Sequence, residues 1–227
     1  MSDQVAETGS ELSPPRQLWV DTLEQIIAKL NLSEVTAADG GPHLQLESKA
    51  PMATGNVGNV RLFKGDHLFQ LVTCSIVVPA IQLDSHMLFA FMPSQSAVPH
   101  FTLDSVRAGP TCAFHLDLIP RLDLGANLAY MDEVFTPLTE AYKQGNDIEG
   151  LSPAQLDPRQ YAIMSPWMFV GRANDDAFAE IGGSVNQYLN HWLSLLDKGL
   201  SDEALAGASE AQIAARDAAN KAIIFNP

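Results

Sequence analysis

The stretch PHFTLDSVRAGPTCAFHLDLIPRLDL, residues 99–124, decides the fold class of this 227-residue chain. Its first half alternates: His100, Thr102 and Asp104 have one parity, and mostly apolar residues have the other. Period-two alternation of this kind is typical of a β-strand with one buried face. The Arg-Ala-Gly-Pro segment predicts a turn, and a second alternating run follows with His115 and Asp117. The sequence therefore predicts two neighbouring strands that both carry histidine and aspartate.

Short predicted strands also precede this stretch. Gly, Pro, Asn and Asp residues separate them, and no helix-length pattern interrupts the series. Parallel strands would need crossover connections, usually helical, so we expect an antiparallel meander. The expected strands cover residues 43–47, 59–63, 68–78, 86–92, 99–106 and 112–119.

Helical patterns lie on both sides of the predicted meander. Residues 17–32 carry apolar side chains at a period near 3.6, and we expect further helices over 127–143, 175–197 and 202–224. A hydrophobic stretch at 161–172 contains Pro166. No linker or repeat divides the chain, so we expect a disordered acidic tail over 1–15 and one domain over 16–227. This order predicts an α+β class, with helices packed on a central antiparallel sheet.

The composition limits the partners and the compartment. The formal net charge is −14 and the pI is near 4.6, which disfavours nucleic acid and anionic membranes, since both need a basic footprint. Solubility alone is an alternative reason for this charge. Two cysteines without metal-ligand spacing fit a reducing compartment. No apolar run approaches the roughly 18 residues of a membrane span, and no signal peptide is recognisable. We expect a cytoplasmic protein or, if a transit peptide has been removed, a chloroplast stromal one; the sequence predicts no oligomeric state.

A shared polar face is the main functional feature of the predicted meander. Many antiparallel sheets expose such a face to water, and that alternative stays open. Against it, the face has few lysines and glutamates, includes apolar residues, and belongs to a chain whose helices need a surface to cover. Under helices, its carboxylates and imidazoles would have shifted pKa values and could transfer protons. The expected register places His86 opposite Asp104, Thr102 near His115 and His100 near Asp117, with Phe89, Phe91 and Phe101 on the other face.

Other chemistries have weaker support in the sequence. A metal site from His86, His100, His115 and an aspartate is an alternative by ligand type, although no common ligand spacing is present. No GxSxG elbow supports a serine triad. The GNVGNV segment at 55–60 lacks the strand–turn–helix context of a dinucleotide site. Without a flavin, nicotinamide or P-loop motif, a redox role would need electrons from another protein.

Three blocks of the chain resemble the ferredoxin-dependent bilin reductase superfamily, and red chlorophyll catabolite reductases in particular. They are MLFAFMPSQSAVPHFTLDSV at 87–106, HLDLIPRLDLGANLAYMDEVFTPLTEAYKQ at 115–144 and YAIMSPWMFVGR at 161–172. Their order and spacing agree with that family, and none is a catalytic signature alone. The resemblance implies an α/β/α sandwich that binds a linear tetrapyrrole between one sheet face and the C-terminal helices. It also implies single-electron reduction by ferredoxin, with no flavin, nicotinamide or metal bound.

The resemblance also implies roles for individual residues. The acidic residue late in the 87–106 block is Asp104, which we expect to donate protons to the substrate. His86 is the expected catalytic histidine on the neighbouring strand, and Asp217 is the candidate for a second acidic residue in the C-terminal helices. A carboxylic acid held partly protonated in an apolar pocket is suited to this work, because a reduced tetrapyrrole is more basic.

The remaining expected site residues contact the substrate. Arg121 and Arg172 lie in matched motifs and are candidates for binding propionates, with surface solvation or helix capping as the alternative. His100, Thr102 and His115 are expected to line the substrate pocket. A protein that carries a tetrapyrrole without reducing it remains an alternative on the same fold.

Overall fold

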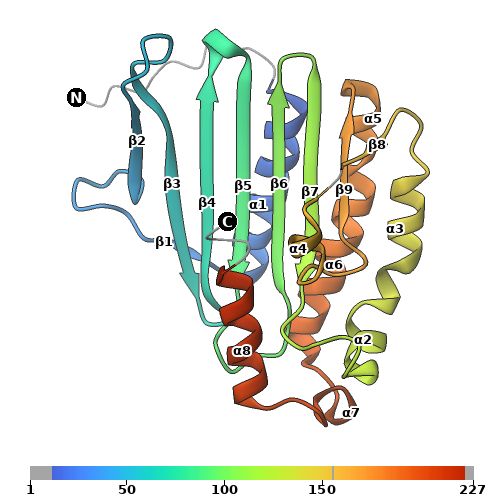
Figure 1. Ribbon diagram of the computed structural model, residues 1–227. Helices are drawn as coiled ribbons and strands as arrows, with labels where there is room; N and C mark the ends of the chain where they lie inside the picture. Colours follow the sequence, from blue (N-terminus) through green and yellow to red (C-terminus); the bar gives the residue numbers. More distant parts are fainter. Residues whose placement is uncertain (1–11, 155, 223–227) are drawn as a thin grey trace.

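A nine-stranded antiparallel sheet forms the centre of the computed structural model, which describes residues 12–154 and 156–222. The strand order is β1-β3-β4-β5-β6-β7-β9-β8, and β2 also pairs with β3. Helices cover both faces, which gives three layers (Figure 1). The expected α+β sandwich with a central antiparallel sheet is therefore confirmed.

The strands follow the predicted meander closely. β3 to β7 are neighbours in chain order, and each pair is antiparallel. The bounds are β1 (Ser33–Glu34), β2 (Leu44–Ser48), β3 (Gly55–Gly65), β4 (Leu68–Val78), β5 (Leu83–Phe91), β6 (His100–Ala108), β7 (Thr111–Ile119), β8 (Ser152–Pro153) and β9 (Phe169–Ala173).

The helices are shorter than the sequence pattern suggests. Each of the three expected C-terminal helices is divided into pieces, and the hydrophobic stretch at 161–172 contains strand β9. The bounds are α1 (Pro14–Leu30), α2 (Leu128–Val134), α3 (Thr139–Asn146), α4 (Pro158–Tyr161), α5 (Asp175–Glu180), α6 (Gly182–Lys198), α7 (Asp202–Leu205) and α8 (Glu210–Asn220), with 3₁₀ turns η1 (Pro79–Ile81) and η2 (Thr136–Leu138).

Helix α1 begins earlier than expected. The Ser13 hydroxyl accepts a hydrogen bond from the Arg16 backbone N–H, and Pro14 and Pro15 occupy the first turn, where proline costs no helical hydrogen bond. The expected disordered tail is therefore wrong at Pro14 and Pro15, which are helical. The expectation for residues 1–11 lies outside the described residues.

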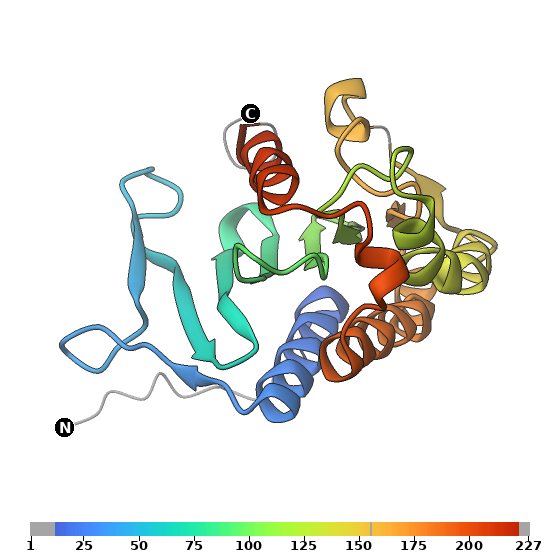
Figure 2. The same cartoon turned by 90° about the horizontal axis from the view of Figure 1, so that it is seen from below.

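One face of the sheet carries the main hydrophobic core. α1, α5 and α6 pack on this face, which we call the α1 face (Figure 1). The predicted apolar stripe of residues 175–197 is buried there, and Trp192 of α6 packs against Phe101 of β6 with 5.4 Å between ring centroids. This packing leaves the opposite face to α8 and the segment around α4, as seen from below in Figure 2. We call that second surface the α8 face.

The pairing of β5 with β6 differs by one residue from the expected register. Met87 lies opposite Asp104, and His86 lies opposite Ser105. Since side chains alternate along a strand, the difference moves every β5 side chain to the other face. His86 therefore lies on the α1 face, whereas Phe89 and its neighbour Phe91 lie on the α8 face. The loop between the two strands sets this register, and the alternation within either strand does not reveal it.

The pairing of β6 with β7 differs by two residues from the expected register and so keeps the expected faces. Asp104 lies opposite His115, and Thr102 lies opposite Asp117. Ala108 and Thr111 close a two-residue turn in which Gly109 has φ of 59°. The tighter turn brings the aspartate of one strand directly beside the histidine of the next.

No helix among residues 12–154 and 156–222 is long and apolar enough to cross a membrane.

Candidate functional site

The α8 face is hollowed by a cavity of about 430 Å³ between the sheet and α8. A neighbouring cavity of about 230 Å³ lies further along β6 and β7. Strands β5 and β6 contribute to both, and the stacked rings of Phe89 and Phe91 lie 5.9 Å apart at their border. The first cavity is lined by Phe69, Phe91, Met92, His100, Asp217 and Lys221, and the second by Met87, Phe89, Thr102, Asp104, His115 and Met164.

Polar side chains of Asp104, Thr102 and His115 line the smaller cavity. Asp104 Oδ1, Thr102 Oγ1 and His115 Nε2 are buried and have no hydrogen-bond partner among the described residues. The two ionisable groups approach to 3.8 Å, between His115 Nδ1 and Asp104 Oδ2. Since buried polar groups are usually hydrogen-bonded, three orphan atoms around one cavity indicate a site prepared for a polar ligand.

Burial sets the protonation of this pair. It raises the pKa of Asp104 to about 7 and lowers the pKa of His115 to about 4, because each ionised form loses hydration. The Asp104 side chain is 32% exposed overall, yet its Oδ1 is enclosed and unpartnered. At neutral pH the site therefore contains a carboxyl group close to its midpoint beside a neutral imidazole, an arrangement suited to proton donation.

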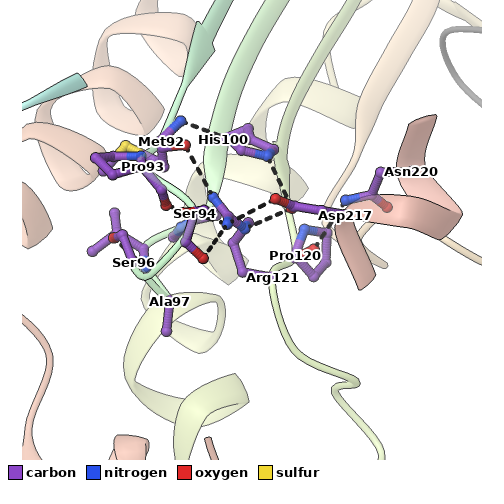
Figure 3. A network of polar contacts seen from close by, with 12 residues as sticks. Met92, Pro93, Ser94, Ser96, Ala97, His100, Pro120, Arg121, Asp217 and Asn220 are labelled. Atoms are coloured by element: carbon purple, nitrogen blue, oxygen red, sulfur yellow. Dashed lines mark hydrogen bonds and ion pairs between the residues drawn. The ribbon is translucent and has the colours of Figure 1, made fainter. Parts of the chain in front are cut away.

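His100, Asp217 and Arg121 form a connected network beside the larger cavity (Figure 3). The Met92 backbone N–H donates to His100 Nδ1 at 2.9 Å, so the ring proton lies on Nε2, 3.4 Å from Asp217 Oδ1. Burial lowers the pKa of His100, and Arg121 and His100 hold the pKa of Asp217 below its usual range against the effect of its own burial. The structure thus joins two of the expected site residues, His100 and Asp217, from distant parts of the chain.

Arg121 makes several contacts within this network. Its side chain is fully buried, and Nη2 donates to Asp217 Oδ2 at 3.0 Å. Nε lies 2.9 Å from Asp217 Oδ1 as an ion pair without hydrogen-bond alignment. The guanidinium also donates to the carbonyls of Met92, Pro93 and Ser94 (Figure 3). The guanidinium thus holds α8 and the 92–94 loop together, and the substrate contact that the resemblance implies for Arg121 stays a prediction.

Arg172 lies where a carboxylate could be bound. It is on β9 opposite Ala113, and two residues from Val170, which pairs with His115. Its side chain is therefore on the α8 face, and it is exposed. The role that the resemblance implies for Arg172 stays a prediction.

His86 does not belong to this site. It lies on the α1 face, where its ring packs 5.0 Å from the Trp19 ring. The expectation of a catalytic His86 beside Asp104 is therefore wrong, and His115 occupies the neighbouring position instead. The register difference between β5 and β6 is the physical reason.

Asp117 is buried on the α8 face, and both of its carboxylate oxygens accept hydrogen bonds. It accepts hydrogen bonds from the hydroxyl and the backbone N–H of Ser165, and burial raises its pKa to about 7. These bonds hold the Ser165–Pro166 segment against β7. Asp117 therefore shapes the wall of the site.

The alternative of a metal centre lacks a suitable donor arrangement. Within the described ranges, no group of three His, Cys, Asp or Glu side chains is placed to hold a metal ion. His86 is separated from His100 and His115 by the sheet itself.

Several contributors to the site were missed by the sequence reading. Phe89 and Phe91 were assigned to the opposite face because the register was one residue off. Gln160 lies in α4, which carried no clear pattern, and Lys221 follows α8. Met164 lies in the hydrophobic stretch at 161–172, which did not single it out. The number of residues in the loop between β5 and β6 decides the register, and therefore the face on which the two phenylalanines lie.

The antiparallel sheet between two helical layers has a counterpart among solved structures. The chain superposes on a crystal structure of phytochromobilin synthase from tomato in complex with biliverdin, with a TM-score of 0.69 and 17% identity over 90% of this chain and 69% of that one. No protein-family model matches the chain.

A second similarity comes from the sequence. The chain is 32% identical over 97 residues to red chlorophyll catabolite reductase from Hordeum vulgare, a match that covers 42% of this chain and 44% of that protein. The chain thus matches less than half the length of this relative. The sequence similarity confirms the expected likeness to red chlorophyll catabolite reductase, and the structural match to phytochromobilin synthase agrees with the expected sandwich fold.

Proposed function

We propose that this protein reduces a linear tetrapyrrole bound between the α8 face and helix α8. Electrons come singly from reduced ferredoxin, and Asp104 supplies a proton. The observation that carries the proposal is the unpartnered Asp104 carboxyl beside His115, facing a cavity with apolar walls. The similarity to red chlorophyll catabolite reductase and the likeness of the fold to phytochromobilin synthase support it.

The chemistry needs a proton donor that remains protonated near neutral pH. Reduction of one double bond takes two electrons and two protons, and each added electron makes the conjugated system more basic. Asp104 has a pKa of about 7 because of its burial, so a large fraction is protonated when the substrate radical forms. His115, neutral at that pH, accepts or donates a hydrogen bond at the pyrrole nitrogens or lactam groups.

The rest of the α8 face positions the substrate. Phe69, Phe91 and Met92 present apolar surface to the tetrapyrrole rings, and His100 and Asp217 add polar groups at one end. Arg172 binds a propionate at the other end of the face. The proposal needs no bound flavin, nicotinamide or metal, because ferredoxin brings each electron. It places the protein where ferredoxin is found, in the cytoplasm or the chloroplast stroma.

The proposal is tested by mixing the purified chain with biliverdin and, separately, with red chlorophyll catabolite. We expect a shifted absorption spectrum on binding, followed by loss of conjugation when reduced ferredoxin is added. Binding with an unchanged spectrum after reduction would identify a tetrapyrrole carrier instead. No binding of either compound would overturn both functions.

A further inference from the structure

A serine, a histidine and an aspartate are linked in series on the α1 face, across the sheet from the proposed tetrapyrrole site. His86 Nδ1 lies 3.0 Å from Ser75 Oγ, and His86 Nε2 lies 2.6 Å from Asp84 Oδ1. Asp84 is acceptor-only when ionised, so the ring carries its proton on Nε2 and accepts the Ser75 hydroxyl proton at Nδ1. The Ser13 hydroxyl donates to the other Asp84 oxygen at 2.5 Å. Each group is thus oriented by the next.

These residues line a cavity rather than a closed core. A hollow of about 550 Å³ lies between α1 and strands β3 to β5, and Ser75 and His86 form part of its wall. This volume is in the range of small-molecule sites. Asn59 lies directly opposite Ser75 on β3 and lines the same cavity. Trp19, Val57 and Val77 supply apolar surface.

The imidazole of His86 is held rigidly. It is 1% exposed, and the Trp19 ring covers it at 5.0 Å. Trp19 is itself fixed by donating its indole N–H to the Met87 carbonyl at 3.2 Å. A fixed base that is bonded to both a hydroxyl and a carboxylate is the arrangement that activates a serine nucleophile.

We propose that Ser75, His86 and Asp84 form a second reactive site that hydrolyses carboxylic esters. Ser75 Oγ attacks the acyl carbon while His86 Nδ1 takes the hydroxyl proton. The bond to the alcohol oxygen then breaks, and His86 returns the proton to that oxygen. Water attacks the acyl-Ser75 ester with His86 again as base, releasing the carboxylic acid and restoring the hydroxyl. The Asn59 amide donates a hydrogen bond to the oxyanion.

The site stands independently of the proposed tetrapyrrole reduction, since the sheet separates the two. The absence of a GxSxG elbow does not argue against it, because triads are defined by geometry and occur in unrelated chain orders. Here Asp84 and His86 share one strand and one face, and the neighbouring strand brings Ser75 to His86.

The first test uses the full-length wild-type chain. We expect turnover of p-nitrophenyl acetate or butyrate above that of the denatured chain. We also expect a fluorophosphonate probe to attach to Ser75, identified by mass spectrometry of the digested protein. Absence of both turnover and labelling at Ser75 would overturn the proposal.

The second test compares Ser75→Ala with Ser105→Ala. Ser105 is a good control because it lies beside His86 on the other side, is also buried in the α1 face and donates to the Pro15 carbonyl at 2.9 Å. We expect Ser75→Ala to lose roughly a thousandfold in ester kcat/KM, and Ser105→Ala to keep the wild-type value. Equal ester turnover in the two variants would overturn the proposal and would show that Ser75, His86 and Asp84 only anchor α1. If Ser75→Ala does not fold, the labelling result on the wild-type chain decides.

Discussion

Arg121 and Asp217, 96 residues apart in the sequence, form a partly buried ion pair that joins the strand end after β7 to helix α8. Arg121 also donates to three carbonyls of the loop between β5 and β6. One guanidinium therefore fixes two walls of the larger cavity on the α8 face. Removing one partner of a buried pair leaves the other charge without compensation, which costs more than the pair itself contributes.

We expect Arg121→Gln to lower the free energy of unfolding by about 3 kcal/mol. Urea unfolding measures this loss. Arg216→Gln is the matched control, because Arg216 lies next to Asp217 on α8 and donates to the Ile163 carbonyl. We expect that control to lose only about 1 kcal/mol. Equal losses would show that the Arg121–Asp217 pair has no special role.

Asp104→Asn tests the proton donor. The amide keeps the size of the carboxyl group, so we expect tetrapyrrole binding to persist while turnover falls by about 100-fold or more. Wild-type turnover should decline as the pH rises through about 7, where Asp104 loses its proton. The variant should lack this decline. The exposed Asp123→Asn serves as the control, and wild-type turnover in Asp104→Asn would refute the role.

Deprotonation of Asp104 and Asp117 should lower the free energy of unfolding as the pH rises from about 4 to about 7. Asp104 and Asp117 keep their protons to about pH 7 in the folded chain, whereas an unfolded aspartate releases its proton near pH 4. In that window the folded state binds more protons, so deprotonation favours unfolding. Asp84 and Asp217, whose pKa values are lowered, act only below this window. Burial lowers the pKa values of His100, His115 and His191, so these groups act within the window and in the opposite direction.

Asp104→Asn and Asp117→Asn should each reduce that pH dependence. The measurement is the urea midpoint at pH values between 4 and 8 for the wild type and both variants. We expect the midpoint of the double variant to rise with pH between about 4 and 6.5, because burial lowers the pKa values of the histidines that remain, His100, His115 and His191. A wild-type midpoint that rises as steeply as that of the double variant would contradict the raised pKa values of both carboxyl groups.

His86 and His115 lie on opposite faces of the sheet, so we expect different roles for them. His115 faces the Asp104 cavity, so His115→Gln should raise the KM for the tetrapyrrole about tenfold by removing a hydrogen bond of roughly 1.4 kcal/mol. His86 faces α1, so His86→Gln should leave kcat/KM for the tetrapyrrole unchanged in the fraction that folds. Steady-state kinetics with reduced ferredoxin compare the two, and the opposite pattern would place His86 in the site.

Arg172→Gln tests the carboxylate contact on the α8 face. We expect a fivefold rise in KM for a tetrapyrrole with free propionates, about the value of one exposed ion pair. The dimethyl ester of the same tetrapyrrole is the matched control, since its affinity should not change. An equal effect on both compounds would show that Arg172 does not bind the propionate.

Much of the fold was predictable from local patterns. The strand Leu68–Val78 has the predicted bounds, and the meander from β3 to β7 follows the predicted order. Turn residues and alternation report these features because each depends on a few neighbouring residues. The C-terminal helices were predicted as too long, since breaks such as the one at Ile181 depend on packing that apolar periodicity does not reveal.

The sequence by itself determined that His100, Thr102 and Asp104 share one face, since alternation along a single strand fixes relative orientation. It also determined the α+β class and the likeness to the bilin reductases. Only the tertiary structure decided that His115 lies opposite Asp104 and that His86 lies beyond the sheet, because hairpin loops set the register between strands. The pairing of Arg121 with Asp217 was decided by the docking of α8, which no local pattern encodes.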